Sequence, residues 1–149
     1  MSVMIRPLQS EDFDAWSELY AAYADFYQVT QTTTMRETVW NWLQDPQHTV
    51  KGLLALDDQG KAIGFIHYRP YARPLAAMMG GFLDDLFVIP SQRGQGVARQ
   101  LLQALAEIGR AHGWSLIRWR TADNNYQART LYDQVAQKTP WLTYEMSCA

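Results

Sequence analysis

The fold is decided by residues 86–98, which read LFVIPSQRGQGVA. An apolar run ends at Pro90, and a short turn that contains Gly94 and Gly96 leads into a segment with helical spacing. This pattern predicts a strand that turns directly into the N-terminus of a helix. Such a turn favours an anion, because the first helical amides have no partner within the helix and the helix dipole is positive there.

Two known phosphate-binding patterns fit this stretch poorly. A dinucleotide fingerprint needs glycine or alanine three residues after the second glycine, and Arg99 stands there. A Walker A loop needs Gly-Lys-Ser/Thr, which the stretch lacks. The alternative is a turn that is packed tightly for structural reasons alone. The residues by themselves do not distinguish this turn from an anion site.

The composition around this stretch limits the class of protein. The chain has 149 residues, is 48% hydrophobic and carries a net charge of −2, which predicts one domain over residues 1–149 and argues against disorder and nucleic-acid binding. The sequence has neither a membrane-length apolar run nor the layout of a secretion signal, so we expect a cytoplasmic protein with no membrane partner. Cys148 is the single cysteine and the three histidines are scattered, so we expect no disulfide and no metal site.

Hydrophobic periodicity predicts elements in the order β-α-α-β-β-β-α-β-α-β, which describes a mixed α/β sheet. Helices are expected to open at Ser10, near Thr34, after Gly96 and at residues 123–125. The proline- and glycine-containing residues 70–81 are predicted to form a loop. The expected strands cover residues 3–8, 50–56, 62–68, 82–89, 115–121 and 141–147.

Two segments resemble the GNAT superfamily of N-acetyltransferases. Residues 93–98 are similar to its acetyl-CoA pyrophosphate loop, and Asn125, Ala128, Leu131 and Tyr132 have the spacing of its downstream motif. The resemblance covers nearly the whole chain. It implies a single-domain, GNAT-type α/β fold with a central mixed, mostly antiparallel sheet flanked by helices, and it implies acetyl-CoA as co-substrate.

A finer similarity links the chain to the branch that contains histone/polyamine and diamine acetyltransferases. It is carried by residues 83–88, Trp119, Thr121, residues 128–133 and the pair Tyr144-Glu145. Members of that branch more often have Glu-Asp where this chain has Asp84-Asp85. The shorter carboxylate at position 84 leaves open which of the two acts as the base.

The resemblance also implies roles for individual residues. Tyr132 is expected to be the general acid, because its phenol stays protonated at neutral pH, and also to contact the cofactor. Asn125 is expected to be a further cofactor contact. Backbone groups are expected to hold the pantetheine arm at Leu86, Phe87 and Val88, and the pyrophosphate at Arg93, Gly94, Gln95, Gly96, Val97 and Ala98.

Acetyl transfer to an amine requires a base, because an aliphatic ammonium with a pKa near ~10.4 is not a nucleophile. Asp84, acting through water and contacting the acceptor, is the preferred base, and Asp85 is the second candidate. Alternation along a strand predicts that these carboxylates point to opposite faces. Tyr27, at the end of an aromatic helix, is expected to wall the acceptor site, since aromatic faces attract ammonium groups. His67 is interpreted as a hydrogen-bonded structural residue rather than a base.

We therefore expect an N-acetyltransferase that acts on a small cationic acceptor such as a polyamine, a diamine or an amino-acid-like amine. Direct transfer in a ternary complex is preferred, because no histidine lies near Cys148 in sequence to activate it. A histone-like protein acceptor and a non-catalytic acyl-CoA-binding module are the alternatives. A homodimer that pairs through residues 141–146 is a further hypothesis, and Glu145 could face either that partner or the substrate.

Overall fold

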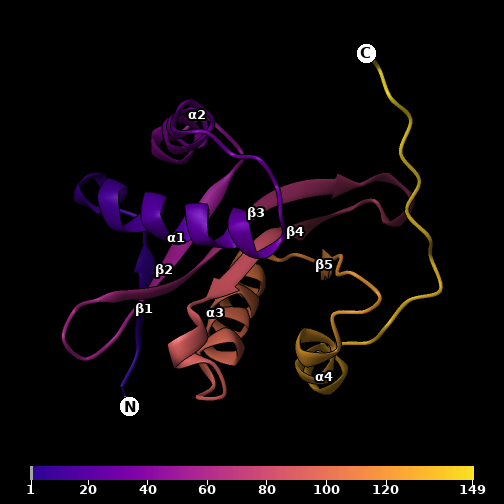
Figure 1. The fold of residues 1–149 in the computed structure, drawn as a ribbon. Coiled ribbons are helices and arrows are strands. Elements are labelled where there is room, and N and C mark those ends of the chain that lie inside the picture. The colour runs from indigo at the N-terminus through magenta and orange to yellow at the C-terminus, as the bar shows by residue number, and fades with distance from the viewer. Residues whose placement is uncertain (1) are drawn as a thin grey trace.

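The computed structural model describes residues 2–149, and its five strands form a sheet with the order β1-β2-β3-β4-β5. Strands β1 to β4 pair antiparallel, whereas β5 joins β4 in parallel, so the expected mixed, mostly antiparallel α/β sheet is confirmed (Figure 1). The elements in chain order are β1 (Met4–Pro7), α1 (Phe13–Phe26), α2 (Thr33–Gln44), β2 (Lys51–Leu56), β3 (Ala62–Arg73), β4 (Met78–Val88), α3 (Val97–His112), β5 (Ile117–Trp119) and α4 (Tyr126–Val135).

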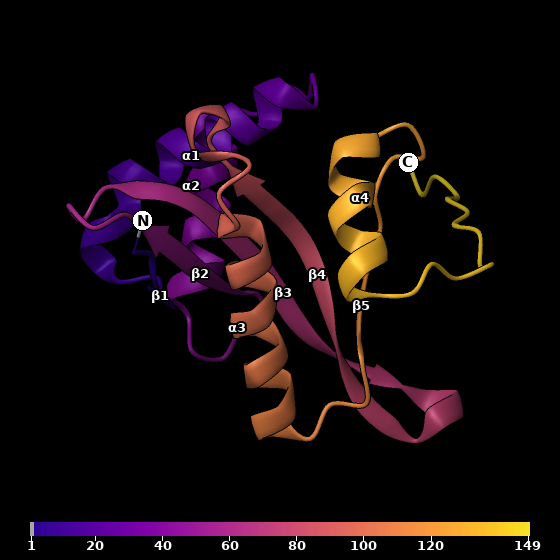
Figure 2. The ribbon, with the colours of Figure 1, turned by 90° about the horizontal axis from the view of Figure 1, so that it is seen from below.

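Helices cover both faces of the sheet, and each face has its own apolar core. On one face, Leu19 of α1 packs with Phe65 of β3 and Phe87 of β4. On the other face, α3 buries a stripe against the sheet, and Leu131 of α4 packs against the same core. Helices α3 and α4 lie beside each other on this second face, while β4 and β5 run apart towards their carboxyl ends (Figure 2).

Helix α3 forms where the sequence predicts it. Val97, Leu101, Leu102 and Leu105 recur at three- and four-residue spacing, and all four side chains are buried. The helix ends at Gly113, whose φ of +71° is the left-handed conformation that glycine accepts without strain.

The expectation of a loop at residues 70–81 is wrong. Strands β3 and β4 continue through this region as a long hairpin, joined by a 3-10 turn at Pro74–Ala76. Beyond Tyr68 the pairing of β3 with β2 has ended, so one edge of β3 is free and tolerates Pro70. Gly81 is required for close packing, because a Cβ there would lie 2.4 Å from the Trp114 ring.

The two N-terminal helix caps differ from the expected positions. Ser10 opens a 3-10 turn, and the buried Asp12 accepts hydrogen bonds from the Gln9 amide and from Arg6 of β1. In α2 the capping residue is Thr32, whose hydroxyl accepts from the Met35 amide, rather than Thr34.

The predicted C-terminal strand at residues 141–147 does not form. This segment has no regular secondary structure, and it leaves α4 as an extended tail that reaches past the β3–β4 hairpin (Figure 1). The side chains of Trp141, Leu142, Tyr144 and Met146 are 78–91% exposed. The alternation of these residues is typical of a strand, but it does not tell whether the same chain supplies an edge for them to pair with.

Candidate active site

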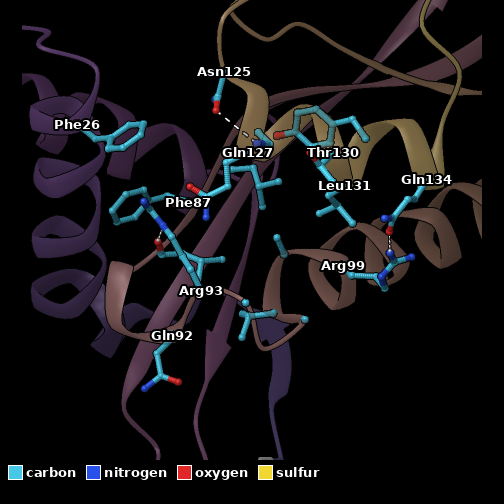
Figure 3. Close-up of a pocket in the computed structure, with 18 of the residues that line it drawn as sticks. Phe26, Phe87, Gln92, Arg93, Arg99, Asn125, Gln127, Thr130, Leu131 and Gln134 are labelled. Carbon is cyan, nitrogen blue, oxygen red and sulfur yellow. Dashed lines mark hydrogen bonds between the residues drawn. The ribbon is translucent and has the colours of Figure 1, made fainter.

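A cavity forms where β4 and β5 separate. Their pairing covers Gly81–Leu83 with Ile117–Trp119, so the following residues of β4 have a free edge on the β5 side. The cavity has a volume of about 540 Å³ and lies between β4, the turn after it and α4 (Figure 3). Its walls are Phe26, Tyr27, Leu86, Phe87, Val88, Gln92, Arg93, Gly94, Gly96, Val97, Ala98, Arg99, Asn125, Gln127, Ala128, Thr130, Leu131, Tyr132 and Gln134.

The floor of the cavity is the turn that leads into α3. Gly94 and Gly96 have φ values of +77° and +82°, and a Cβ at either position would meet no atom within 4 Å. These glycines are therefore needed for their left-handed backbone and leave open space above it. No side chain caps the N-terminus of α3, so its first amides face that space. Such a cradle fits a phosphate of acetyl-CoA.

Arg93 contacts both the end of β4 and the end of α1. Its Nε donates to the Val88 carbonyl oxygen at 3.0 Å, and its guanidinium carbon lies 4.9 Å from the centre of the Phe26 ring and 5.5 Å from that of Phe87. The Val88 carbonyl thus already has a partner within the protein. The backbone of Leu86 and Phe87 offers the remaining polar groups at this wall.

Asn125 and Tyr132 are placed on the α4 wall. The Asn125 side chain caps α4 by accepting from the Ala128 amide at 3.4 Å, and its Nδ2 donates to the Tyr27 hydroxyl at 3.4 Å. The Tyr132 ring packs edge-on against Trp119 with 5.3 Å between centroids. Burial, with a smaller contribution from Tyr27, raises the pKa of Tyr132 to about 12, so its phenol is protonated at neutral pH.

A β-bulge at Asp84 corrects the expected orientation of the two carboxylates. His67 pairs with Asp85 and Tyr68 pairs with Leu83, which leaves Asp84 as the extra residue. Leu83 and Leu86 both pack on the α3 face, so the two aspartates between them are displaced together towards the α1 face. The prediction that they point to opposite faces is therefore wrong, because it assumed unbroken alternation.

The two carboxylates have different partners and opposite pKa shifts. Asp84 forms an ion pair with Arg69 at 3.1 Å, yet burial outweighs this charge and raises the pKa of Asp84. Asp85 lies 2.8 Å from His67 Nδ1. Burial also raises the pKa of Asp85, but the hydrogen bond from His67, together with the Tyr23 and Tyr20 hydroxyls, lowers the pKa below its usual value. Asp85 is therefore ionised at neutral pH.

The structure gathers most of the expected site residues, with clear exceptions. Of residues 93–98, Gln95 does not line the cavity, and neither Asp84 nor Asp85 does. Glu145 lies on the tail, 84% exposed and 3.7 Å from Arg120. The sequence analysis does not predict the hydrogen bond from Arg99 of α3 to Gln134 of α4. The spacing of Gln127, Leu131 and Gln134, which places them on one face of α4, is the signal that could have indicated that Gln134 lines the cavity.

Residues 2–149 bear on two further properties, metal binding and membrane crossing. No group of three or more His, Cys, Asp and Glu side chains could hold a metal ion in this part of the chain. Likewise, none of the described helices is long and apolar enough to cross a membrane.

Comparisons with known proteins agree with this geometry. A sequence profile described as the acetyltransferase (GNAT) family matches residues 16–136. The D-amino-acid N-acetyltransferase of Saccharomyces cerevisiae is 28% identical over 144 residues, which cover 96% of this chain and 89% of the yeast protein. A thialysine N-epsilon-acetyltransferase of Caenorhabditis elegans is 35% identical over 72 residues, 45% of each chain. The structure of a ribosomal-protein-alanine N-acetyltransferase from Brucella melitensis biovar Abortus 2308 superposes with a TM-score of 0.82, 25% identity and 99% coverage of both chains.

The glycine turn gives a test with a matched control. We expect Gly96→Ala to weaken coenzyme A binding about 5- to 30-fold, because the left-handed backbone costs a non-glycine residue about 1–2 kcal/mol. Gly60→Ala is the control, since Gly60 has a φ of +79° and equally open surroundings but lies in the β2–β3 turn. Calorimetric titration of both variants measures the difference, and unchanged affinity in Gly96→Ala contradicts the assignment.

Proposed function

We propose that this chain, which belongs to the acetyltransferase (GNAT) family and is an acetyl-CoA-dependent N-acetyltransferase, acetylates a primary amine of a small cationic acceptor by direct transfer in a ternary complex. Polyamines, diamines and amino-acid-like amines are the acceptor classes. The observation that carries the proposal is the pair of carboxylates at the β4 bulge, adjacent in sequence to the cavity wall at Leu86. The names of the yeast and nematode relatives, which refer to D-amino acids and thialysine, support amines of this size.

Acetyl-CoA would lie along the cavity with its phosphates on the α3 turn. Amides between Gly94 and Ala98 would bind the pyrophosphate, and backbone groups of Leu86 and Phe87 would pair with the pantetheine arm. Asn125 would be a further contact. When bound, the thioester supplies the acetyl group, and a hydrogen bond from the β4 backbone would polarise its carbonyl.

The acceptor would reach the site from the α1 face of the sheet. Asp84 and Asp85 supply negative charge there, and Tyr27, at the end of α1 and beside Asn125, supplies an aromatic wall. Asp84 is the preferred base, acting through water, because its raised pKa makes it the stronger proton acceptor of the two. Asp85 is the second candidate.

Tyr132 would be the general acid. The free amine nitrogen forms a bond to the carbonyl carbon, the carbon–sulfur bond breaks, and the leaving sulfur receives the phenolic proton. The carboxylate accepts the ammonium proton before the attack and the second nitrogen proton after it, and passes each to solvent through water. Tyr132 regains its own proton from solvent. Because the pKa of Tyr132 is about 12, this donor is present throughout the neutral and mildly alkaline range.

Two alternatives make different demands on the site. Acetylation of a protein or peptide amine is favoured by the similarity to an enzyme named for the alanine of a ribosomal protein. A non-catalytic acyl-CoA-binding module would need the cavity alone, without Asp84 or a protonated Tyr132.

The proposed function is tested by thiol release from acetyl-CoA against polyamines, diamines, amino acids and basic peptides. We expect turnover with small cationic amines, since the α1 face offers them two carboxylates. Turnover with basic peptides alone would support the protein-acceptor alternative. Binding of acetyl-CoA without turnover of any amine would contradict the proposal and favour the module.

A substitution of Tyr132 separates the enzyme from the module. We expect Tyr132→Phe to lower kcat by about 100-fold or more while coenzyme A affinity stays the same, because only the proton donor is lost. Tyr126→Phe is the matched control on the same helix, since Tyr126 is 70% exposed and does not line the cavity. Steady-state kinetics and calorimetry of both variants check this. Equal kcat values in the two variants are incompatible with the acid role.

We propose further that two copies of the chain pair through the C-terminal tail. Residues 141–143 of the tail and all of β5 line a second, open groove of about 850 Å³. The tail exposes apolar side chains to water, and a second copy would bury them against this groove. We expect a second copy to fill the groove. The tail is an extended segment with exposed apolar side chains, and such a segment can pair with a free sheet edge.

Sedimentation velocity tests the pairing. We expect a dimer for the wild-type chain and a monomer for the double variant Trp141→Asp and Leu142→Asp, because the variant replaces two apolar side chains that the pairing buries with carboxylates, whose burial is costly. Val29→Asp, which also charges an exposed apolar position, should leave the dimer intact. A wild-type monomer at high micromolar concentration contradicts the pairing.

A further inference from the structure

A chain of hydrogen bonds runs from α1 through β3 to the carboxylate of Asp85. The indole Nε1 of Trp16 donates to His67 Nε2 at 2.9 Å, and His67 Nδ1 lies 2.8 Å from Asp85 Oδ2. The Tyr20 hydroxyl donates to the same Oδ2 at 3.3 Å. Trp16 and His67 are almost completely buried, at 0% and 1% exposure, so this chain is isolated from solvent up to its last member.

The partners of His67 fix its tautomer. An indole N–H can only donate, so the Nε2 atom that faces Trp16 must be an acceptor without a proton. The ring proton is therefore on Nδ1, and it is donated to the carboxylate of Asp85. Both ring nitrogens are in use, so His67 cannot take a proton from the acceptor amine without breaking its bond to Trp16.

The charge of Asp85 has no cationic partner. Among the described residues, Arg69 pairs with the neighbouring Asp84, and no lysine or arginine forms an ion pair with Asp85. The groups that face Asp85 are His67 from β3, Tyr20 and Tyr23 from α1, and Asp84 from β4. The carboxylate is thus stabilised by dipoles, and its side chain is still 21% exposed. An anion in this state attracts a cation that arrives from solution.

We propose that His67 is a positioning residue, which Trp16 locks as the Nδ1–H tautomer so that it orients Asp85 to bind the ammonium group of the acceptor. The bonds from His67 and Tyr20 both go to Oδ2, so Oδ1 keeps capacity to accept a hydrogen bond from the amine. This inference rests on the proposed function, and it assigns Asp85 the binding of the acceptor cation while Asp84 remains the preferred base.

A merely structural His67 would have different consequences. If His67 only filled the core, its loss would lower stability without changing the pH profile of turnover. If it orients Asp85, its loss removes a donor to a buried carboxylate, and the pKa of Asp85 rises. Binding of the ammonium group needs ionised Asp85 and is lost as the pH falls through this pKa. The acid limb of the pH profile of the amine KM therefore moves to higher pH, whereas Asp84 sets the acid limb of kcat.

The test compares four variants of the full chain. His67→Leu removes the donor at similar volume, and His67→Asn keeps a donor near the position of Nδ1. Trp16→Phe removes the indole N–H that locks the tautomer, together with part of a ring that packs against Tyr20 and Trp40. His112→Leu is the matched control, because His112 is exposed at the end of α3. We measure kcat and the KM of the best amine from pH 5 to 9, coenzyme A affinity by calorimetry, and the thermal midpoint.

We expect His67→Leu to raise the KM of the amine about 10- to 100-fold, the range for a lost hydrogen bond to a charged group, and to move the acid limb upward. Coenzyme A affinity should stay within about twofold, His67→Asn should recover most of the activity, and His112→Leu should match the wild type. Trp16→Phe should shift the acid limb in the same direction as His67→Leu but by a smaller amount. If His67→Leu does not fold, Trp16→Phe provides the test in its place.

Two outcomes overturn the inference in distinguishable ways. A His67→Leu protein that keeps the wild-type KM and acid limb overturns the positioning role while the proposed function stands. A wild-type protein that binds acetyl-CoA but acetylates no amine overturns both.

Nitrogen-15 NMR of the wild-type histidines adds a readout independent of turnover: we expect the Nδ1–H tautomer for His67, and the Nε2–H tautomer contradicts the proposal.

Discussion

The site depends on the short pairing between β4 and β5. A parallel strand that followed β4 to its end would satisfy the backbone from Asp84 to Val88 and fill the space beside it. Pairing instead stops at Leu83, so β4 keeps polar backbone groups on a free edge, and α4 is set apart from α3 by the width of the cavity. Buried backbone groups need partners, and a ligand that lies along this edge can supply them.

The sheet separates the two kinds of charge that the reaction brings together. On the α3 face, the glycine turn and the helix N-terminus present amides that suit an anionic ligand. On the α1 face, the bulge presents Asp84 and Asp85, which suit a cation. The bulge is the link between them, because the extra residue Asp84 turns both carboxylates to one face, and the next residue, Asp85, directly precedes Leu86 at the cavity wall.

The sequence predicts the fold, and most of the residues that it assigns to the cofactor line one cavity in the structure. The 86–98 stretch, the amphipathic α3 and the Asn125 cap all depend on local spacing, which is visible in one chain. The bulge at Asp84 is not visible in the sequence, because an extra residue in a strand can be recognised only when the partner strand is known. Pro70 and Gly81 indicate a loop in the sequence for the same reason. Pro70 is tolerated because β2 no longer pairs with β3 beyond Tyr68, and Gly81 is needed because the Trp114 ring packs against it, and both partners are distant in sequence. The bond between Trp16 and His67 likewise joins residues that no local pattern connects.

The anchoring of α4 has a consequence for the cavity itself. This helix has no buried residues, and its polar links to the rest of the molecule include Asn125 to Tyr27 at one end and Arg99 to Gln134 at the other. Helix α3, in contrast, is held by a continuous buried stripe. Regions with few buried contacts open at lower free energy than the whole protein unfolds. The wall that carries Tyr132 is therefore expected to open at lower free energy than the wall formed by α3.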